Sequence, residues 1–303
     1  MSLMQELGML IGRHVGEARP QVAHTNIPGL IVAASSSPTE PLHHIFEPVF
    51  VLVVQGVKKI ELGDSAFRYG SGEYLVVSVD LPISSRVDRA SVDIPCLSVA
   101  LTLKPAAIAT LLLETAGDAR HSGEGNLAGL GVSNAPPELL DAVLRMLRLL
   151  DRPRDARVLA PSIEREILWW LLCGPQGGMV RQIGLADSRL SQITCAVRWI
   201  RANYARALRI DDLSELAGMS VSTFHRHFRA ITTMTPLQYQ KQVRLQEARV
   251  RLLSQADDAA TIGFSVGYNS PSQFTREYRR FYGVTPGRDA ARLKIDATAA
   301  ENT

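Results

Sequence analysis

The chain has 303 residues, of which 46% are hydrophobic and 21% charged; this balance is ordinary for a folded globular protein and excludes a largely disordered one. The length allows two domains, each with its own core. The formal net charge is only +3, but from Ser188 onward 17 Lys and Arg stand against 10 Asp and Glu, leaving 16 against 20 before that point. A basic segment joined to an acidic one indicates a polyanionic partner, although such an excess is also common on a solvated surface.

The cysteines and the N-terminal residues exclude several further classes. Cys96, Cys173 and Cys195 have no CxxC or Cys/His spacing, so the sequence indicates neither a disulfide framework nor a zinc site. The first residues, MSLMQELGMLIGRHVGEARP, lack the basic start and the sustained apolar core of a signal peptide. The apolar run around Trp169 and Trp170 is too short to span a bilayer. We therefore expect a cytoplasmic protein without a membrane segment.

The first half of the chain predicts a helix followed by a β-rich domain. Leu3, Leu7, Leu10 and Ile11 have helical spacing, and Pro20 is expected to end that helix. From about residue 25 to residue 104, short β-rich runs are separated by Gly-Asp, Gly-Ser-Gly and Pro-containing breaks; these runs are LIVAASS, FVLVVQG, KKIELG, AFRY, YLVVSVDL and LSVALTL. This pattern is typical of an all-β sandwich or barrel.

Three helices are predicted next, beginning at Pro105, at Pro136 and at about Ala156, with a proline at or near each start. The third contains EILWWLLC and is apolar around most of its circumference, so it is either a subunit interface or a helix buried inside the protein. The glycine-rich stretch GPQGGMVRQIGLADSR predicts a linker, at about residues 176–190. Everything after it reads as helical.

The decisive pattern is a repeat in the basic tail. STFHRHFRAITTMTP, residues 222–236, and SQFTREYRRFYGVTP, residues 272–286, align without a gap at a separation of fifty positions. Aromatic and aliphatic residues fall at i, i+4 and i+7 in both copies, which places them on one helix face: Phe224, Phe228 and Ile231, then Phe274, Tyr278 and Phe281. One structural unit therefore occurs twice.

The opposite face of each repeated helix is polar and basic. It carries Ser222, His225, Arg226 and Arg229 in the first copy, and Ser272, Thr275, Arg276 and Arg279 in the second. Ser220 and Ser270 are expected to cap these helices, because a serine hydroxyl accepts a hydrogen bond from an exposed backbone N–H. A glycine turn and a short apolar helix precede each cap, which gives the plan of a helix-turn-helix.

Such a helix can enter the DNA major groove, where arginine donates two hydrogen bonds to guanine and Ser, Thr or Gln bonds base edges or phosphates. A single amphipathic helix with exposed arginines is often merely solvated. The repeat, the caps, the glycine turns and the basic excess together favour DNA binding. PLQYQKQVRLQEARVRLLSQ, residues 236–255, predicts one helix that joins the two units.

From about Gln192 to Leu293 the tail resembles the AraC/XylS family of bacterial transcription regulators. The resemblance rests on LAGMSVSTFHRHFR, TPLQYQKQVRLQEARVRLL and VGYNSPSQFTREYRRFYGVTP. It implies DNA-facing residues at Ser222, His225, Arg226, Ser272, Gln273, Thr275 and Arg276. Gly263 departs from the family, which usually has a small helix former such as alanine there, and glycine inside a helix costs about 1 kcal/mol.

The front part is similar to the cupin-like N-terminal domain of one AraC subgroup, through IPGLIVAASSSPTEPLHHIFEPVFVLVVQGVKKIELGD and YLVVSVDLPISSRV. The implied fold is α+β, with an N-terminal cupin-like β-barrel and flanking helices before an all-α domain with two helix-turn-helix units. A pocket for an effector is expected near His43, His44, Phe46 and Glu47. No metal or other cofactor is expected, because GSGEYLVVSVDLP lacks the later histidine that a cupin metal site needs.

These interpretations divide the chain into an effector-binding and dimerisation domain at 1–175, a linker at 176–190 and a DNA-binding domain at 191–294. The two helix-turn-helix units are expected at about 210–232 and 258–282. The predicted protein is a non-enzymatic transcription regulator whose partners are promoter DNA, a small-molecule effector, a second copy of itself and, in an activator, RNA polymerase. Two alternatives stay open: a front domain that only dimerises, and a cupin enzyme with a DNA-binding tail.

Overall fold

The computed structural model describes residues 2–16, 21–115, 128–254 and 258–301. The chain divides into two compact units. Unit 1 comprises residues 1–194 together with 226–233, and unit 2 comprises residues 195–225 and 234–303. No helix in these described stretches combines the length and the apolar character needed to cross a membrane.

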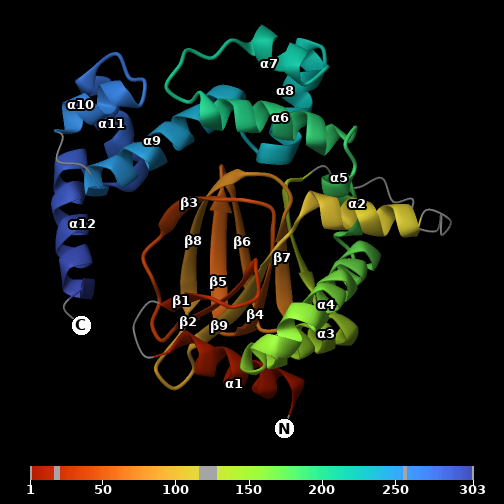
Figure 1. Cartoon of the computed structure of the whole chain (residues 1–303). Helices are drawn as coiled ribbons and strands as arrows, with labels where there is room; N and C mark the ends of the chain where they lie inside the picture. The colour runs from red at the N-terminus through yellow and green to blue at the C-terminus, as the bar shows by residue number, and fades with distance from the viewer. Residues whose placement is uncertain (1, 17–20, 116–127, 255–257, 302–303) are drawn as a thin grey trace. The chain divides into compact units, whose positions relative to one another are not determined.

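Unit 1 is built around two antiparallel sheets (Figure 1). The six-stranded sheet has the order β1 (Gln21–His24), β2 (Leu30–Ser35), β9 (Cys96–Thr102), β4 (Val49–Gln55), β7 (Glu73–Val77) and β10 (Leu130–Asn134). The four-stranded sheet has the order β3 (Leu42–Phe46), β8 (Leu81–Arg89), β5 (Val57–Leu62) and β6 (Ser65–Gly70). The fold is therefore mixed α and β, as expected, but the described strands form two separate sheets and not one closed barrel.

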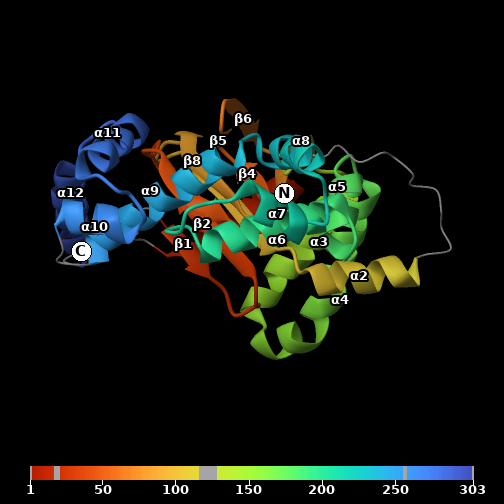
Figure 2. The same cartoon turned by 90° about the horizontal axis from the view of Figure 1, so that it is seen from above.

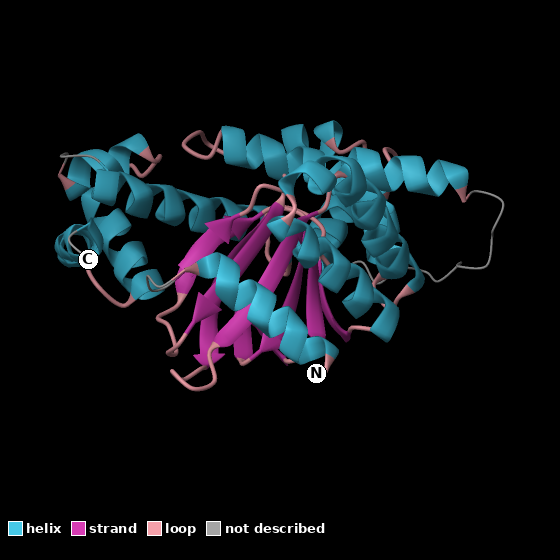
Figure 3. Cartoon of the chain, turned by 60° about the horizontal axis from the view of Figure 1, so that its bottom comes forward, coloured by secondary structure: helices cyan, strands magenta, loops and turns pink. Residues whose placement is uncertain are grey.

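Both faces of the larger sheet are covered. Five consecutive residues of β4, from Phe50 to Val54, are buried, which requires protein on either side of the strand. One side faces the smaller sheet, and α1 (Leu3–Val15) packs across β2, β4 and β9 on the other (Figure 3). Leu7, Leu10 and Ile11 are the buried residues of α1, as their spacing predicted, and a capping box at Ser2 begins the helix.

Four strands escaped prediction, and each has a physical reason. β1 and β10 are edge strands, so each has only one pairing neighbour. β3 contains two adjacent histidines, whereas β8 contains a proline and two serines, so neither shows a clean alternation of apolar and polar residues. Their pairing depends on partners distant in sequence, such as β3 with β8 and β10 with β7.

The three helices predicted after the sheets are present as α2 (Pro105–Glu114), α3 (Pro137–Arg148) and α4 (Pro153–Cys173), with a short 3-10 turn, η1, at Leu149–Asp151. In α4, Ile163, Ile167, Leu168, Leu171 and Leu172 are buried inside unit 1. Packing against α3 and α5 accounts for the apolar character of α4 without a second subunit.

The stretch 176–190 is not the structureless linker that its glycines suggested. Most of it is a helix, α5 (Gly177–Gly184), which buries Met179, Val180 and Ile183 and packs against α2 and α4. The glycines serve close packing here: a Cβ on Gly184 would lie 2.7 Å from the Ile108 side chain. Glycine composition alone cannot separate a flexible linker from a tightly packed helix.

The remaining helices give the predicted double helix-turn-helix. α6 (Arg189–Ala202) leads to α7 (Ile210–Leu216) and α8 (Val221–Thr232), and α9 (Pro236–Ser254) leads to α10 (Ala259–Ser265) and α11 (Pro271–Tyr282) (Figure 2). α12 (Pro286–Glu301) follows and packs on α9 and α11.

The turns between the paired helices repeat at the level of single hydrogen bonds. In the first, the N–H groups of Gly218 and Met219 donate to the carbonyls of Glu215 and Ser214, and in the second those of Gly267 and Tyr268 donate to Phe264 and Gly263. The positive φ angles of Gly218 (64°) and Gly267 (95°) allow these turns. The second turn has one extra residue, Asn269, before its serine cap. Both caps are confirmed, since Ser220 accepts from the Thr223 N–H and Ser270 from the Gln273 N–H, each at 3.4 Å.

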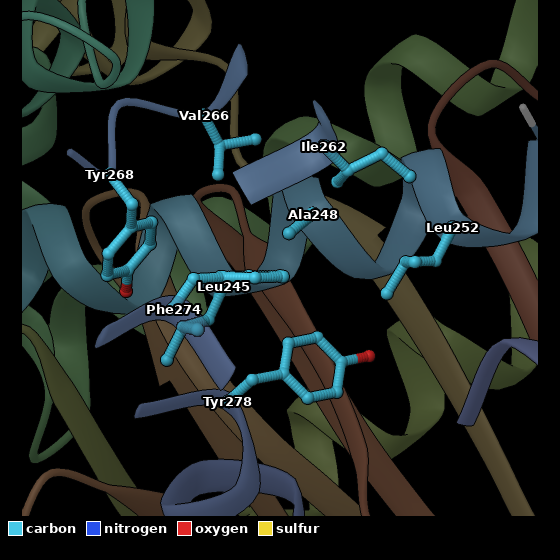
Figure 4. Packing of buried hydrophobic residues seen from close by; sticks show 8 residues of the cluster. All are labelled: Leu245, Ala248, Leu252, Ile262, Val266, Tyr268, Phe274 and Tyr278. Carbon is cyan, nitrogen blue, oxygen red and sulfur yellow. The ribbon is translucent and has the colours of Figure 1, made fainter. Parts of the chain in front are cut away.

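A compact core holds the second helix-turn-helix against α9 (Figure 4). It comprises Leu245, Ala248, Leu252, Ile262, Val266, Tyr268, Phe274 and Tyr278. Phe274 and Tyr278 are fully buried, with ring centroids 5.5 Å apart in an edge arrangement, whereas Phe281 is only partly buried. Of the predicted aromatic stripe, Phe274 and Tyr278 therefore belong to this core, and Phe281 lies at its edge.

Gly263, the departure from the family pattern, has a structural role in this core. A Cβ at this position would lie 2.9 Å from Cδ1 of the buried Phe274 ring. The missing side chain thus allows α10 to lie directly against α11, which offsets the intrinsic cost of glycine in a helix.

We predict that Gly263→Ala destabilises unit 2, although alanine is the better helix former. The gain of about 1 kcal/mol in helix propensity is outweighed by overpacking, for a net loss of about 1–2 kcal/mol in the free energy of unfolding. Calorimetry of the full chain measures this. Gly287→Ala is the matched control, because its Cβ would meet nothing within 4 Å. A more stable Gly263→Ala variant would contradict the packing role.

Candidate nucleic-acid interface

The second repeated helix, α11, exposes a groove on the face opposite its aromatic core. The groove has a volume of about 760 Å³ and is lined by Pro271, Ser272, Thr275, Arg276, Arg279, Arg280 and Thr285. Four of these residues belong to the polar stripe predicted from the sequence. Three were not predicted as site residues: Pro271 is the first residue of the helix, Arg280 precedes Phe281 on its flank, and Thr285 lies beyond the end of α11.

The first repeated helix, α8, has the same two-sided character. Phe224, Phe228 and Ile231 are all fully buried. The predicted stripe faces solvent, with exposed side chains at Ser222, His225, Arg226 and Arg229. His227 is mostly buried, and its pKa is lowered by burial and by the positive charges of Arg189 and Arg226.

Gln273 is not among the residues that line the groove, and it is held by a neighbour on its own helix. Its Nε2 donates to Oε1 of Glu277 at 3.3 Å, and Glu277 also accepts from Lys241 of α9 at 3.1 Å and from the Tyr268 hydroxyl at 3.0 Å. Burial opposes ionisation of Glu277, but the hydrogen bonds from Lys241, Gln273 and Tyr268 keep its pKa below the ordinary value. The amide of Gln273 is therefore oriented before any ligand arrives.

The four residues predicted as an effector pocket do not form one group. His44 and Phe46 share a face of β3, with ring centroids 4.2 Å apart. His43, the preceding residue of β3, faces the opposite side of the sheet. On that side its charge contributes slightly to the lowered pKa of Glu61, whose main cause is the hydrogen bond from Lys59. Glu47 is exposed just after the strand. No group of three or more His, Cys, Asp or Glu side chains in the described stretches could hold a metal ion.

A residue that the sequence did not single out occupies the space between the sheets. Lys58 of β5 reaches across to the six-stranded sheet, where its Nζ donates to Ser98 Oγ at 2.7 Å. Within the described residues this is its one hydrogen bond, and no carboxylate pairs with it. Burial lowers the pKa of Lys58, while burial and the nearby Lys58 charge lower that of His44. Part of the Lys58 side chain remains accessible.

Two separate ranges of the chain match models of known regulator families. The family model described as "AraC-type transcriptional regulator N-terminus" matches residues 26–179, and the model described as "Helix-turn-helix domain" matches residues 213–292. The uncharacterized HTH-type transcriptional regulator YdeC of Bacillus subtilis is 21% identical over 251 residues, covering 81% of this chain and 84% of that protein. The HTH-type transcriptional activator RhaS of Escherichia fergusonii is 28% identical over 160 residues, covering 50% of this chain and 56% of that protein.

Solved structures show the same fold. ToxT from Vibrio cholerae superposes with a TM-score of 0.54 at 10% sequence identity, covering 86% of this chain and 98% of that one. A ToxT structure described as bound to an unsaturated fatty acid has a TM-score of 0.53 at 9% identity, covering 88% of this chain and 97% of that one. The first family model spans half of the chain and the second covers the repeat. The chain therefore belongs to the AraC-type transcriptional regulators, a family of DNA-binding regulators and not of enzymes.

Proposed function

We propose that α8 and α11 bind promoter DNA in successive major grooves and that a small carboxylate ligand inside unit 1 modulates this binding. The observation that carries the DNA part is the repeated two-sided helix: each copy is capped by serine, buries aromatic rings on one face and exposes a polar and basic stripe on the other. Helices that enter adjacent grooves on one side of a duplex lie about one turn, roughly 34 Å, apart.

The stripes divide into two roles by their place on the helices. Arg226 and Arg276 stand at equivalent positions, six residues after the serine cap, and we assign them contacts to base edges. Arg229 and Arg279 stand one turn later, and we assign them contacts to phosphates. Arginine suits the first role because its planar fork donates two hydrogen bonds to guanine, and it suits the second through charge.

Substitution of the two kinds of arginine separates these roles. We expect Arg226→Ala or Arg276→Ala to cost about 1–3 kcal/mol of DNA-binding free energy and to relax sequence preference at one position. Arg279→Ala should weaken all sequences to a similar degree and reduce the slope of log affinity against log salt by about 1. Fluorescence anisotropy on a site selected in vitro from random DNA measures both effects.

Arg154→Ala is the control, because it removes an exposed positive charge in α4, which belongs to neither helix-turn-helix unit. It should leave affinity and salt dependence nearly unchanged. Equal affinities of the Arg226→Ala, Arg279→Ala and wild-type proteins for the selected DNA site would contradict the assignment.

The proposal for the effector rests on Lys58. An ammonium group held inside a protein is costly unless it is paired, and its one described hydrogen bond is to the neutral Ser98. A carboxylate between the sheets would pair with the charge, and the adjacent His44 and Phe46 rings could cover the rest of a small molecule. The ToxT structure described as bound to an unsaturated fatty acid supports a carboxylate as the ligand class.

We expect straight-chain fatty acids to raise the thermal midpoint of unit 1 and to change DNA affinity, whereas the matching alcohols do neither. Because a carboxylate favours the protonated form of Lys58, whose pKa burial lowers, binding should weaken as pH rises through the Lys58 pKa. Lys58→Met should abolish the response. Without ligand, the free energy of unfolding of the Lys58→Met protein should be between that of the wild type and about 1 kcal/mol higher, since a buried charge is removed. A Lys58→Met protein that still responds to the acids would refute the site.

A homodimer is the third part of the proposal, because two DNA-binding units on one promoter raise affinity through effective concentration. The apolar residues of α4 are buried within unit 1, so the dimer contact is expected elsewhere on that unit. The relative RhaS is named a transcriptional activator; if this chain is an activator as well, contact with RNA polymerase is also expected. Sedimentation velocity at micromolar protein, with and without DNA, tests the dimer; a monomer under both conditions would rule it out.

A further inference from the structure

The segment between α6 and α7 receives an unusual number of hydrogen bonds from a single side chain of α9. Arg244 donates from Nε to the carbonyl of Tyr204 at 2.7 Å, and from Nη2 to the carbonyls of Arg206 at 3.0 Å and Ala205 at 3.4 Å. Its Nη1 donates in the other direction, to the carbonyl of Gly267 at 2.8 Å. One guanidinium group thus joins the chain that enters the first helix-turn-helix to the turn of the second.

Neighbouring contacts reinforce the same junction. Gln240, one turn earlier on α9 and almost fully buried, donates from Nε2 to the carbonyls of Tyr204 at 3.0 Å and Arg206 at 2.7 Å. Arg251, two turns later than Arg244, bonds the Tyr204 hydroxyl at 2.7 Å and the Ser265 hydroxyl of α10 at 2.8 Å. The two arginines on one side of α9 therefore each contact both the segment that leads into α7 and the second helix-turn-helix.

The turn of the second helix-turn-helix also touches the 204–206 segment directly. A Cβ on Gly267 would lie 2.3 Å from the carbonyl oxygen of Ala205, so only glycine allows the approach. Gly267 also has a φ of 95°, which glycine adopts without strain. The second turn is therefore seated on the 204–206 segment, and Arg244 closes the contact from the side.

The chemistry of the junction requires arginine in particular. All four acceptors of Arg244 are backbone carbonyls, and they lie around the plane of the guanidinium on three of its nitrogens. Lysine would keep the charge but, as a single ammonium centre on a flexible stem, could not reach these carbonyls in a fixed planar arrangement. Because those donors are occupied inside the protein, Arg244 is poorly suited to bind a phosphate.

We propose that Arg244 is a positioning residue that sets the separation of the two recognition helices and thereby the spacing of the two DNA blocks that the protein reads. This inference rests on the proposed function. If two linked helices bind as one rigid body, the second helix finds its block at high effective concentration only when the DNA spacing matches the protein. Loosening the junction lowers that effective concentration and widens the range of tolerated spacings.

The test compares the full chain and its variants on the site selected in vitro, on each block alone, and on sites with a base pair inserted or removed between the blocks. Each inserted base pair shifts the second block by about 3.4 Å along the duplex. We expect the wild type to lose about tenfold or more in affinity with either change. Arg244→Gln should lose about tenfold on the native spacing, bind each single block within about twofold of wild type, and discriminate among spacings less than about threefold.

Arg244→Lys distinguishes positioning from charge, because it keeps the positive charge and loses the fork. It should behave like Arg244→Gln. Gly267→Ala, which pushes the second turn away from the 204–206 segment, should do the same. Thermal unfolding identifies any variant that has lost its fold; Tyr204→Phe, which removes only the hydroxyl that Arg251 bonds, then provides a milder test with a smaller shift in the same direction.

The inference would be overturned if a folded Arg244→Gln protein discriminated among block spacings as strongly as the wild type does. It would also be overturned if Arg244→Lys behaved like the wild type. Equal losses on the full site and on each single block would also overturn it, because they indicate a direct DNA contact. A wild-type protein that reads only one block and ignores spacing would instead be a failure of the proposed two-groove function.

Discussion

The exposed polar stripes of α8 and α11 depend on burial of the opposite face of each helix. Phe224 and Phe228 in α8, and Phe274 and Tyr278 in α11, are each completely removed from solvent. Burial of one such aromatic side chain contributes about 1.5–3 kcal/mol, so rotation of either helix about its axis is strongly opposed. Because residues three and four apart share a face, fixing the aromatic stripe also fixes the direction of the polar one. The serine caps and glycine turns then set where each helix begins.

This dependence explains why the DNA-binding half could be read from the sequence. Its signals are local: the aromatic spacing, the serine before each helix and the glycine at each turn lie within about one helical element of one another. The front half was read less completely, since β3, β8 and β10 owe their structure to partners far away in the sequence. The stretch 176–190 was misread because glycine composition has two opposite meanings, and burial of Met179, Val180 and Ile183 decides between them.

The residues that sequence analysis missed are those whose surroundings are set by tertiary structure. Lys58 stands in KKIELG beside Lys59, and nothing local distinguishes the lysine that enters the protein from the one that pairs with Glu61 at the surface. Arg244 is one of several basic residues along α9, and only the fold brings the carbonyls of Tyr204 and Gly267 to it. His43 and His44 were expected together, yet adjacent residues of a strand face opposite sides.

We propose that the repeat contacts DNA twice, with one helix in each of two successive major grooves. Hydroxyl-radical footprinting of the full chain on a site selected in vitro distinguishes this arrangement from binding through a single helix. Two helices in successive grooves should give two protected segments on one side of the duplex, separated by about one helical turn. Protection at one block should be lost in Arg226→Ala and at the other in Arg276→Ala. A single protected segment that both substitutions weaken alike would contradict it.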